Sequence, residues 1–191
     1  INMNFDIFWR KNFDLIGYTP TQGLDGEVQK MGNVANMKSH GVEVTLSTKN
    51  IATKDFTWTS DLTFSYAKET ITKLLSRANV LNLCYGVGSQ PFREGYPRSA
   101  LFSIPFVGLN DEGLPQFINE KGEITVSDIN MQEYENVDFL KYEGPTDPTT
   151  TGGFNNSLKY KNWTLNLFLT YSFGNKIRLD KVFAAAYSDM S

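Results

Sequence analysis

The segment Trp163–Phe173 alternates between apolar and polar side chains over its whole length. Its odd positions are all apolar or aromatic, and its even positions are polar except for Phe168. Successive side chains of a β-strand point to opposite faces, so the pattern predicts a strand with one apolar and one mostly polar face. Trp163 begins the apolar face, leucines follow, and Tyr171 and Phe173 end it. A strand that crosses a lipid bilayer has this layout, with about 9–11 residues and aromatic girdles at both interfaces.

Composition is compatible with such a strand and excludes other classes. The chain has 191 residues, of which 40% are hydrophobic and 14% aromatic, and its mean hydropathy is −0.33. A transmembrane helix needs about 18 or more consecutive apolar residues, and no such run occurs. A β-barrel wall needs none, because its inner face is polar. The net charge of −3 provides no basic surface for nucleic acid.

Further segments show the same alternation, and the connections between them differ in length. The alternating segments are residues 2–9, 42–46, 56–66 and 154–160. The connections run long, short, long, short: residues 11–40, 49–55, 67–151 and 161–162. Outer-membrane barrels combine short periplasmic turns with long extracellular loops, and a meander places every second link on the same side. Residues 161–162 are expected to form a tight hairpin turn.

The long stretch 67–151 loses the two-residue period and is expected to be a functional loop or a subdomain. Within it, residues 71–75 are predicted to form a helical turn or two. Residues 117–126 are predicted to form a small hairpin, with residues 119–122 as its turn.

Several blocks resemble the SusC/RagA-type TonB-linked outer-membrane proteins, in the same order along the chain. Residues 33–46 (NVANMKSHGVEVTL) are similar to the family pattern N-x-G-x-M-x-N-x-G-[VI]-E-[LV]-x-[LI]. Further blocks that resemble the family are residues 56–58 with 62–68, 138–148 with 151–163, and 169–177. The chain departs from the family at Ala35, where Gly is common, at Ser39, where Asn is common, and over 102–116. These departures leave the alternating strands intact and bear on ligand identity.

The resemblance implies a fold and a function. The family fold is a large antiparallel transmembrane β-barrel of about 22 strands around a plug domain. The family imports nutrients, glycan or peptide oligomers, across the outer membrane of Gram-negative bacteria. Import is powered through TonB, and a SusD-like surface lipoprotein lies over the barrel as a lid. On this basis we expect outer-membrane localisation, contact with the lipid bilayer and no cofactor.

The chain has about five clear strands, too few to close a barrel, and open sheet edges do not survive in lipid. We therefore expect residues 1–191 to be one fragment of a TonB-dependent receptor barrel domain, from its C-terminal half. Residues 67–151 would be a long extracellular loop region. The plug domain and the segment that binds TonB would lie outside this chain.

Catalytic chemistry is not predicted. The chain has a single histidine, His40, and a single cysteine, Cys84, so the usual zinc sites are not favoured. We expect His40 to be a surface residue and Cys84 a small apolar one. Residues 110–113 and 119–123 faintly resemble calcium loops but lack the full signature, which favours turns. No catalytic, cofactor or metal residue is assigned, and the substrate-binding residues stay unknown.

Two groups of side chains are candidates for contact with a solute. One group consists of polar residues on the predicted inner face, which contact the solute in transit or, as the favoured alternative, solvate the barrel wall or hydrogen-bond the plug: Thr57, Thr59, Asp61, Thr63, Asn166 and Thr170. Loop aromatic residues stack on sugars, pack against the lid, or form a small core of the loop, which is the favoured alternative: Tyr85, Phe92, Tyr96 and Phe102. Phe168 is the aromatic residue on the polar face and the first to check for contact with a plug.

Two alternatives belong to other classes. One is a soluble β-sandwich that binds carbohydrate, which would bury Leu165, Leu167 and Leu169 in a protein core. A barrel would leave these three side chains exposed as part of an apolar band. The other is a β-rich hydrolase, which would need a pair of carboxylates in a cleft, and the sequence marks no such pair.

Overall fold

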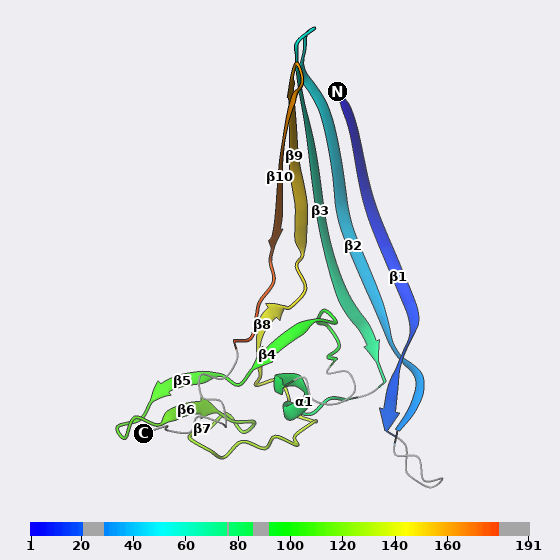
Figure 1. Cartoon of the computed structure of the whole chain (residues 1–191). Coiled ribbons are helices and arrows are strands. Elements are labelled where there is room, and N and C mark those ends of the chain that lie inside the picture. Colours follow the sequence, from blue (N-terminus) through cyan, green and yellow to red (C-terminus); the bar gives the residue numbers. More distant parts are fainter. Residues whose placement is uncertain (21–28, 76, 86–91, 180–191) are drawn as a thin grey trace.

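The computed structural model describes residues 1–20, 29–75, 77–85 and 92–179. Its largest element is a long, curved five-stranded sheet with the order β1-β2-β3-β9-β10 (Figure 1). Every neighbouring pair of strands is antiparallel, which confirms the predicted all-β antiparallel fold. The strands are β1 (Asn2–Pro20), β2 (Gln29–Ala52), β3 (Phe56–Leu74), β9 (Thr150–Tyr160) and β10 (Trp163–Phe173).

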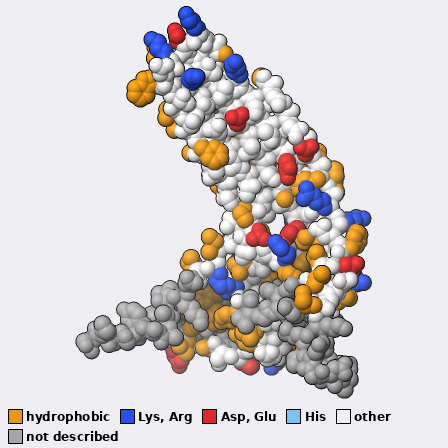
Figure 2. Space-filling model, turned by 45° about the vertical axis from the view of Figure 1, so that its right-hand side comes forward, with side chains coloured by type: hydrophobic (Ala, Val, Ile, Leu, Met, Phe, Trp, Pro, Cys, Tyr) orange, Lys and Arg blue, Asp and Glu red, His pale blue; other side chains and the backbone are white. Residues whose placement is uncertain are grey.

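The two short connections lie together at one end of the sheet. Tyr160 pairs with Trp163, so residues 161–162 form the predicted two-residue turn. Lys161, the first residue of the turn, has a φ of 51°, and a positive φ at this position is a feature of the primed turns that match the twist of hairpin strands. Its N–H donates to the carbonyl oxygen of Asp55 in the other short connection, at 2.8 Å. Figure 2 shows Lys and Arg side chains gathered at this end of the molecule.

The prediction of a long irregular connection over residues 11–40 is wrong. β1 continues to Pro20 and β2 begins at Gln29, and the two strands pair as far as Pro20↔Gln29. Backbone hydrogen bonds hold such a ladder together even where the side chains do not alternate in polarity. The predicted turn-forming residues 22–26 lie outside the described residues.

The predicted helical turn over residues 71–75 is also wrong, because β3 continues to Leu74. Ile71 pairs with Met37 of β2 and is only 1% exposed. Its side chain is therefore buried as part of the sheet and not as part of a helix. β9 pairs with β3 only as far as Tyr66. Beyond that point the loop takes its place, since the Ile71 N–H donates to the Tyr96 carbonyl at 2.9 Å. The irregular region expected from residue 67 therefore begins after β3.

The connection between β3 and β9 is a small subdomain at the other end of the sheet (Figure 1). Its described residues form one short helix and two small sheets, β4-β8 and β5-β6-β7. The hairpin predicted over residues 117–126 is confirmed, since Phe117 pairs with Thr125 and Ile118 with Ile124. The elements are α1 (Val80–Tyr85), β4 (Ala100–Ser103), β5 (Phe106–Leu109), β6 (Pro115–Ile118), β7 (Ile124–Thr125) and β8 (Lys141–Pro145).

This subdomain has a hydrophobic core of its own. Its buried residues are Val80, Leu83, Cys84, Phe102 and Leu140. Tyr96 lies edge-on to Phe102 with ring centroids 5.0 Å apart. The Arg93 guanidinium lies 4.9 Å from the Tyr96 ring centroid, forms an ion pair with Asp138, and donates to the Val137 carbonyl at 3.2 Å. The loop is therefore a packed unit and not an extended excursion of the chain.

Candidate functional site: two chemically distinct faces of one sheet

One face of the five-stranded sheet is largely apolar, because the registers align apolar positions of all five strands. One cross-strand row consists of Met3, Leu46, Leu62, Phe154 and Leu169. On β10, Leu165, Leu167 and Leu169 are 55%, 53% and 66% exposed. No second sheet packs on this face within the described part of the chain. The exposure contradicts the β-sandwich alternative and agrees with an apolar band that meets lipid.

Aromatic side chains border this apolar face at both ends. Phe56, Tyr160 and Trp163 form one row beside the short connections. Tyr66 and Phe173 lie toward the loop end, one on each side of Thr150. On β10, ten residue-to-residue steps lead from Trp163 to Phe173, which corresponds to about 25 Å along the barrel axis at the usual strand rise and tilt. That height matches the lipid-facing band of outer-membrane barrels.

Two glycines accept aromatic rings from the neighbouring strand. Tyr171 of β10 lies directly opposite Gly152, where a Cβ atom would come within 2.3 Å of its ring. The Tyr171 hydroxyl then reaches across β9 and donates to the Thr63 carbonyl at 3.1 Å. On the opposite face, Phe8 lies over Gly41, where a Cβ atom would be 2.5 Å from the ring. Both glycines provide space for a ring, which fixes the register of two strand pairs.

A hydrogen-bonded polar cluster interrupts the apolar face between its aromatic end and its centre. Asn156 Oδ1 accepts from Trp58 Nε1 at 3.0 Å and from Ser60 Oγ at 2.7 Å. Asn50 Nδ2 donates to Ser60 Oγ at 2.7 Å, and Thr48 Oγ1 donates to Asn50 Oδ1 at 2.9 Å. The cluster links β2, β3 and β9, so polar groups that would be costly in lipid are bonded to one another.

The other face of the sheet is mostly polar, and all six predicted inner-face residues lie on it. Thr63 pairs with Gly153, which pairs with Thr170. Asp61 pairs with Asn155, whose Nδ2 donates to Asp61 Oδ2 at 3.4 Å. Phe168 belongs to the same face and is 69% exposed, so its ring is available for a contact outside the described residues. Thr57, Thr59 and Asn166 complete the predicted set.

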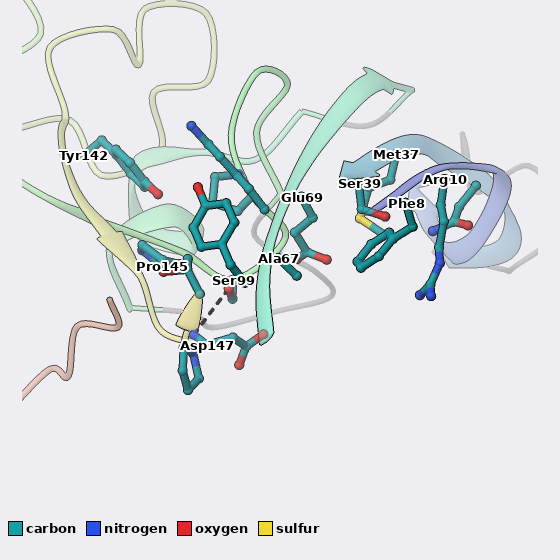
Figure 3. A pocket seen from close by; sticks show the side chains of 16 residues that line it. Phe8, Arg10, Met37, Ser39, Ala67, Glu69, Ser99, Tyr142, Pro145 and Asp147 are labelled. Carbon is teal, nitrogen blue, oxygen red and sulfur yellow. Dashed lines mark hydrogen bonds between the residues drawn. The ribbon is translucent and has the colours of Figure 1, made fainter. Parts of the chain in front are cut away.

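A cavity of about 600 Å³ lies where the polar face meets the loop subdomain. Figure 3 shows Ala67 and Glu69 on the side of β3 that faces Phe8 and Arg10. Arg98 of the loop lies between two carboxylates, with Nε 3.8 Å from Glu69 Oε1 and Nη2 3.6 Å from Asp147 Oδ2. Sequence reasoning missed this cavity. The aromatic residue Phe8 at a polar-face position was a usable signal, but its partner Gly41 is identified only by the register.

His40 and Cys84 are in separate elements and do not form a site. His40 is an exposed residue of β2, paired with Trp9 and Lys68, which confirms the surface prediction. Cys84 is buried in the core of the loop subdomain, 4% exposed. Burial raises the pKa of its thiol, and the Arg178 guanidinium acts in the opposite direction. No group of three or more His, Cys, Asp or Glu that would hold a metal ion occurs among the described residues.

The two segments that resemble calcium loops are turns. Asn110 Oδ1 accepts the N–H groups of Glu112 and Leu114, at 3.0 and 2.8 Å. Asn119 Oδ1 accepts those of Lys121 and Glu123, at 3.1 and 2.9 Å. Backbone donors therefore use both amide oxygens, as expected of turns closed by Asn.

The loop aromatic residues mostly form cores, as the favoured alternative predicted. Phe102 is fully buried, Tyr96 packs against it, and Phe92 packs against the cluster of Val34, Ala35 and Ile71. Tyr85 differs, with 54% of its surface exposed. Of the four residues, Tyr85 is the one free to contact a lid or a solute.

The sequence of this chain is similar to parts of two TonB-dependent receptors. No family model matches the chain. The chain is 27% identical over 191 residues to TonB-dependent receptor P3 of Formosa agariphila, covering 93% of this chain and 19% of that protein. It is 23% identical over 199 residues to TonB-dependent receptor SusC of Bacteroides thetaiotaomicron, covering 94% of this chain and 18% of that protein. The chain thus spans about a fifth of the length of either receptor.

Solved structures of the RagAB peptide importer share the fold. The closed-closed state matches with a TM-score of 0.67 and 22% identity, over 91% of this chain and 19% of that one. The open-open state matches with a TM-score of 0.68 and 22% identity, over 91% and 18%. The five-stranded sheet and its loop subdomain therefore have the fold of one portion of this importer. No helix in the described ranges is both long and apolar enough to span a membrane.

Proposed function

We propose that this chain is a portion of a SusC/RagA-type TonB-dependent receptor, and that the full-length protein imports nutrients across the outer membrane of a Gram-negative bacterium. Its similarity in sequence to two TonB-dependent receptors and in fold to the RagAB importer supports the proposal. The observation that carries the proposal is the chemical division of the sheet. One face is apolar, with the three leucines of β10 more than half exposed, and aromatic residues border it at both ends. The other is polar and contains the cavity at the loop junction. A barrel wall between lipid and an aqueous lumen needs this division.

The orientation of the sheet follows from the lengths of its connections. The short connections at residues 53–55 and 161–162 would face the periplasm, and the loop subdomain within residues 67–151 would be extracellular. Lysines near the short connections, such as Lys54 and Lys161, would then lie near the inner headgroups. Residues 1–191 would form part of one barrel domain, which other segments close around a plug.

The mechanism is transport and not catalysis. A glycan or peptide oligomer would be captured at the outer surface beneath a SusD-like lipoprotein. TonB, acting through a segment outside this chain, would displace the plug so that the solute passes along the polar face. The residues of this chain contribute the wall and the external loop. Thr57, Thr59, Asp61, Thr63, Asn166 and Thr170 line the path, and Tyr85 is available to the lid.

The test uses the full-length parent protein in its own host. Fractionation should place it in the outer membrane, released only by detergent. Cells should take up the imported oligomer, and deletion of this protein or collapse of the proton-motive force by an ionophore should abolish the uptake. Release of the protein into buffer without detergent would contradict the proposal, as would uptake that persists without the proton-motive force.

A further inference from the structure

We propose that Arg10, on the polar face of β1, is a binding residue for a carboxylate group of the imported solute. The inference rests on the proposed import function for the placement of this face toward the lumen. Arg10 lies in the row Arg10–Ser39–Glu69, which crosses β1, β2 and β3 beside the cavity. The cavity's volume of about 600 Å³ is within the usual range for small-molecule sites, roughly 300–1,000 Å³.

The Arg10 guanidinium is held in place by an aromatic ring and not by an acid. Its Cζ lies 4.3 Å from the centroid of the Phe8 ring. The Phe8 ring lies over Gly41, where no side chain displaces it. Stacking on a ring occupies the face of a guanidinium and leaves its N–H edge free for two parallel hydrogen bonds to a carboxylate. A guanidinium held in this way loses little freedom when it binds.

The acids that line the cavity are already engaged with another cation. Arg98 lies between Glu69 and Asp147, within 3.8 and 3.6 Å of their carboxylate oxygens. Glu69 Oε1 is buried and has no hydrogen-bond partner among the described residues, so the ion pair with Arg98 is the interaction that balances its charge there. Arg10 itself forms no ion pair with any residue that the structure describes. Arg10 therefore brings to the cavity lining a positive charge that no described acid pairs with, and Lys68 is a second such cation in that lining.

The chemistry that fits is a carboxylate on a short oligomer, and two sources provide it. One is the C-terminus of a peptide, and the other is a uronic acid of an oligosaccharide. Phe8 would add an apolar surface beside the bound group, and the Ser39 hydroxyl in the next strand would offer a hydrogen bond. A neutral oligosaccharide would gain none of the charge-assisted hydrogen bonds.

The experiment measures binding to the full-length transporter in detergent by titration calorimetry, with no energy source present. The probes are trialanine against trialanine amide, and trigalacturonate against maltotriose. We expect at least one carboxylate probe to bind at least about tenfold more tightly than its uncharged counterpart, as one charge-assisted pair provides. The pair that shows the difference identifies the source of the carboxylate.

Two variants separate Arg10 from charge in general. Arg10→Gln should remove the preference for the carboxylate probe. Lys49→Gln should keep it, because Lys49 lies on the same face near the short connections, away from the cavity. Equal binding of both members of each probe pair would overturn the inference, as would equal effects of the two substitutions. Binding is independent of TonB, so failure of the uptake test with the binding pattern intact would contradict the import function alone.

Discussion

At the residue scale, the glycines beneath aromatic rings decide how closely the strands pair. Gly152 lies between Tyr171 and Thr63, and a Cβ atom there would be 2.3 Å from the Thr63 carbonyl oxygen. Backbone cannot move away as a flexible side chain can. Gly153, one residue along, would place its Cβ atom 3.4 Å from the Phe168 ring, an ordinary contact distance. Adjacent glycines on the two faces therefore have different roles.

We expect Gly152→Ala to lower the free energy of unfolding of the barrel by about 1–3 kcal/mol, the usual cost of overpacking. Gly153→Ala is the matched control and should change it by much less. Urea unfolding of the full-length protein in lipid vesicles measures both. Equal destabilisation by the two substitutions would show that the close approach at Gly152 does not matter.

Because burial raises the pKa of the Cys84 thiol, we expect the loop core to lose stability at alkaline pH. A group whose pKa rises on folding contributes stability below its ordinary pKa, about 8.5 for a thiol, and loses that contribution as the pH rises through the folded value. We expect iodoacetamide to modify Cys84 more slowly than free glutathione at pH 8. In the Cys84→Ala variant, the loop should lose less stability above that pH than in the wild-type protein. Limited proteolysis of the loop as a function of pH measures this loss. A pH profile that the substitution leaves unchanged would contradict this account.

At the element scale, the polar cluster on the apolar face connects three strands. Its central atom, Asn156 Oδ1, accepts from both Trp58 and Ser60. Such a cluster is tolerated in lipid only while its members bond to one another, because water is absent there. The loop subdomain follows the same principle in water, where Asn110 and Asn119 close turns through backbone N–H groups.

A double-mutant cycle tests the cluster. Trp58→Phe and Asn156→Leu should each destabilise the barrel, because each leaves a former partner unpaired. The double variant should cost less than the sum, with a coupling of about 1 kcal/mol. Vesicle-based unfolding gives the four free energies. Additive effects would mean that the 3.0 Å contact between Trp58 Nε1 and Asn156 Oδ1 contributes nothing.

At the scale of the whole molecule, the sheet separates two solvents. A charged substitution should therefore destabilise the barrel at one residue of the centre of β10 and leave its stability nearly unchanged at the next residue. Leu167 belongs to the apolar face and Asn166 to the polar face. We expect Leu167→Arg to destabilise the barrel by about 2–4 kcal/mol, the cost near the bilayer midplane, and Asn166→Arg to be nearly neutral.

The measurement is the fraction of full-length protein assembled in the outer membrane as a heat-modifiable barrel. The two substitutions introduce the same side chain one residue apart, so each serves as the control for the other. If Asn166→Arg blocks assembly and Leu167→Arg does not, the assignment of the faces is reversed.

The sequence by itself determined which residues form the central parts of the strands and which faces they present. Alternation in Trp163–Phe173 requires one apolar and one polar face wherever the strand is placed, because the strand period is two. The two-residue link at 161–162 likewise required an antiparallel neighbour. The strand extensions to Pro20 and Leu74 were not predictable in this way, because they depend on backbone pairing with another strand and leave no periodic signal.

Only the tertiary structure decided which side chains meet across strands and loops. Register places Phe8 over Gly41 and aligns Arg10 with Ser39 and Glu69, although these residues lie far apart in the sequence. A shift of one residue would move every side chain to the opposite face. The core around Phe102 and the position of Arg98 between two acids likewise depend on long-range packing. Local sequence carries no record of such contacts, because their partners come from distant segments.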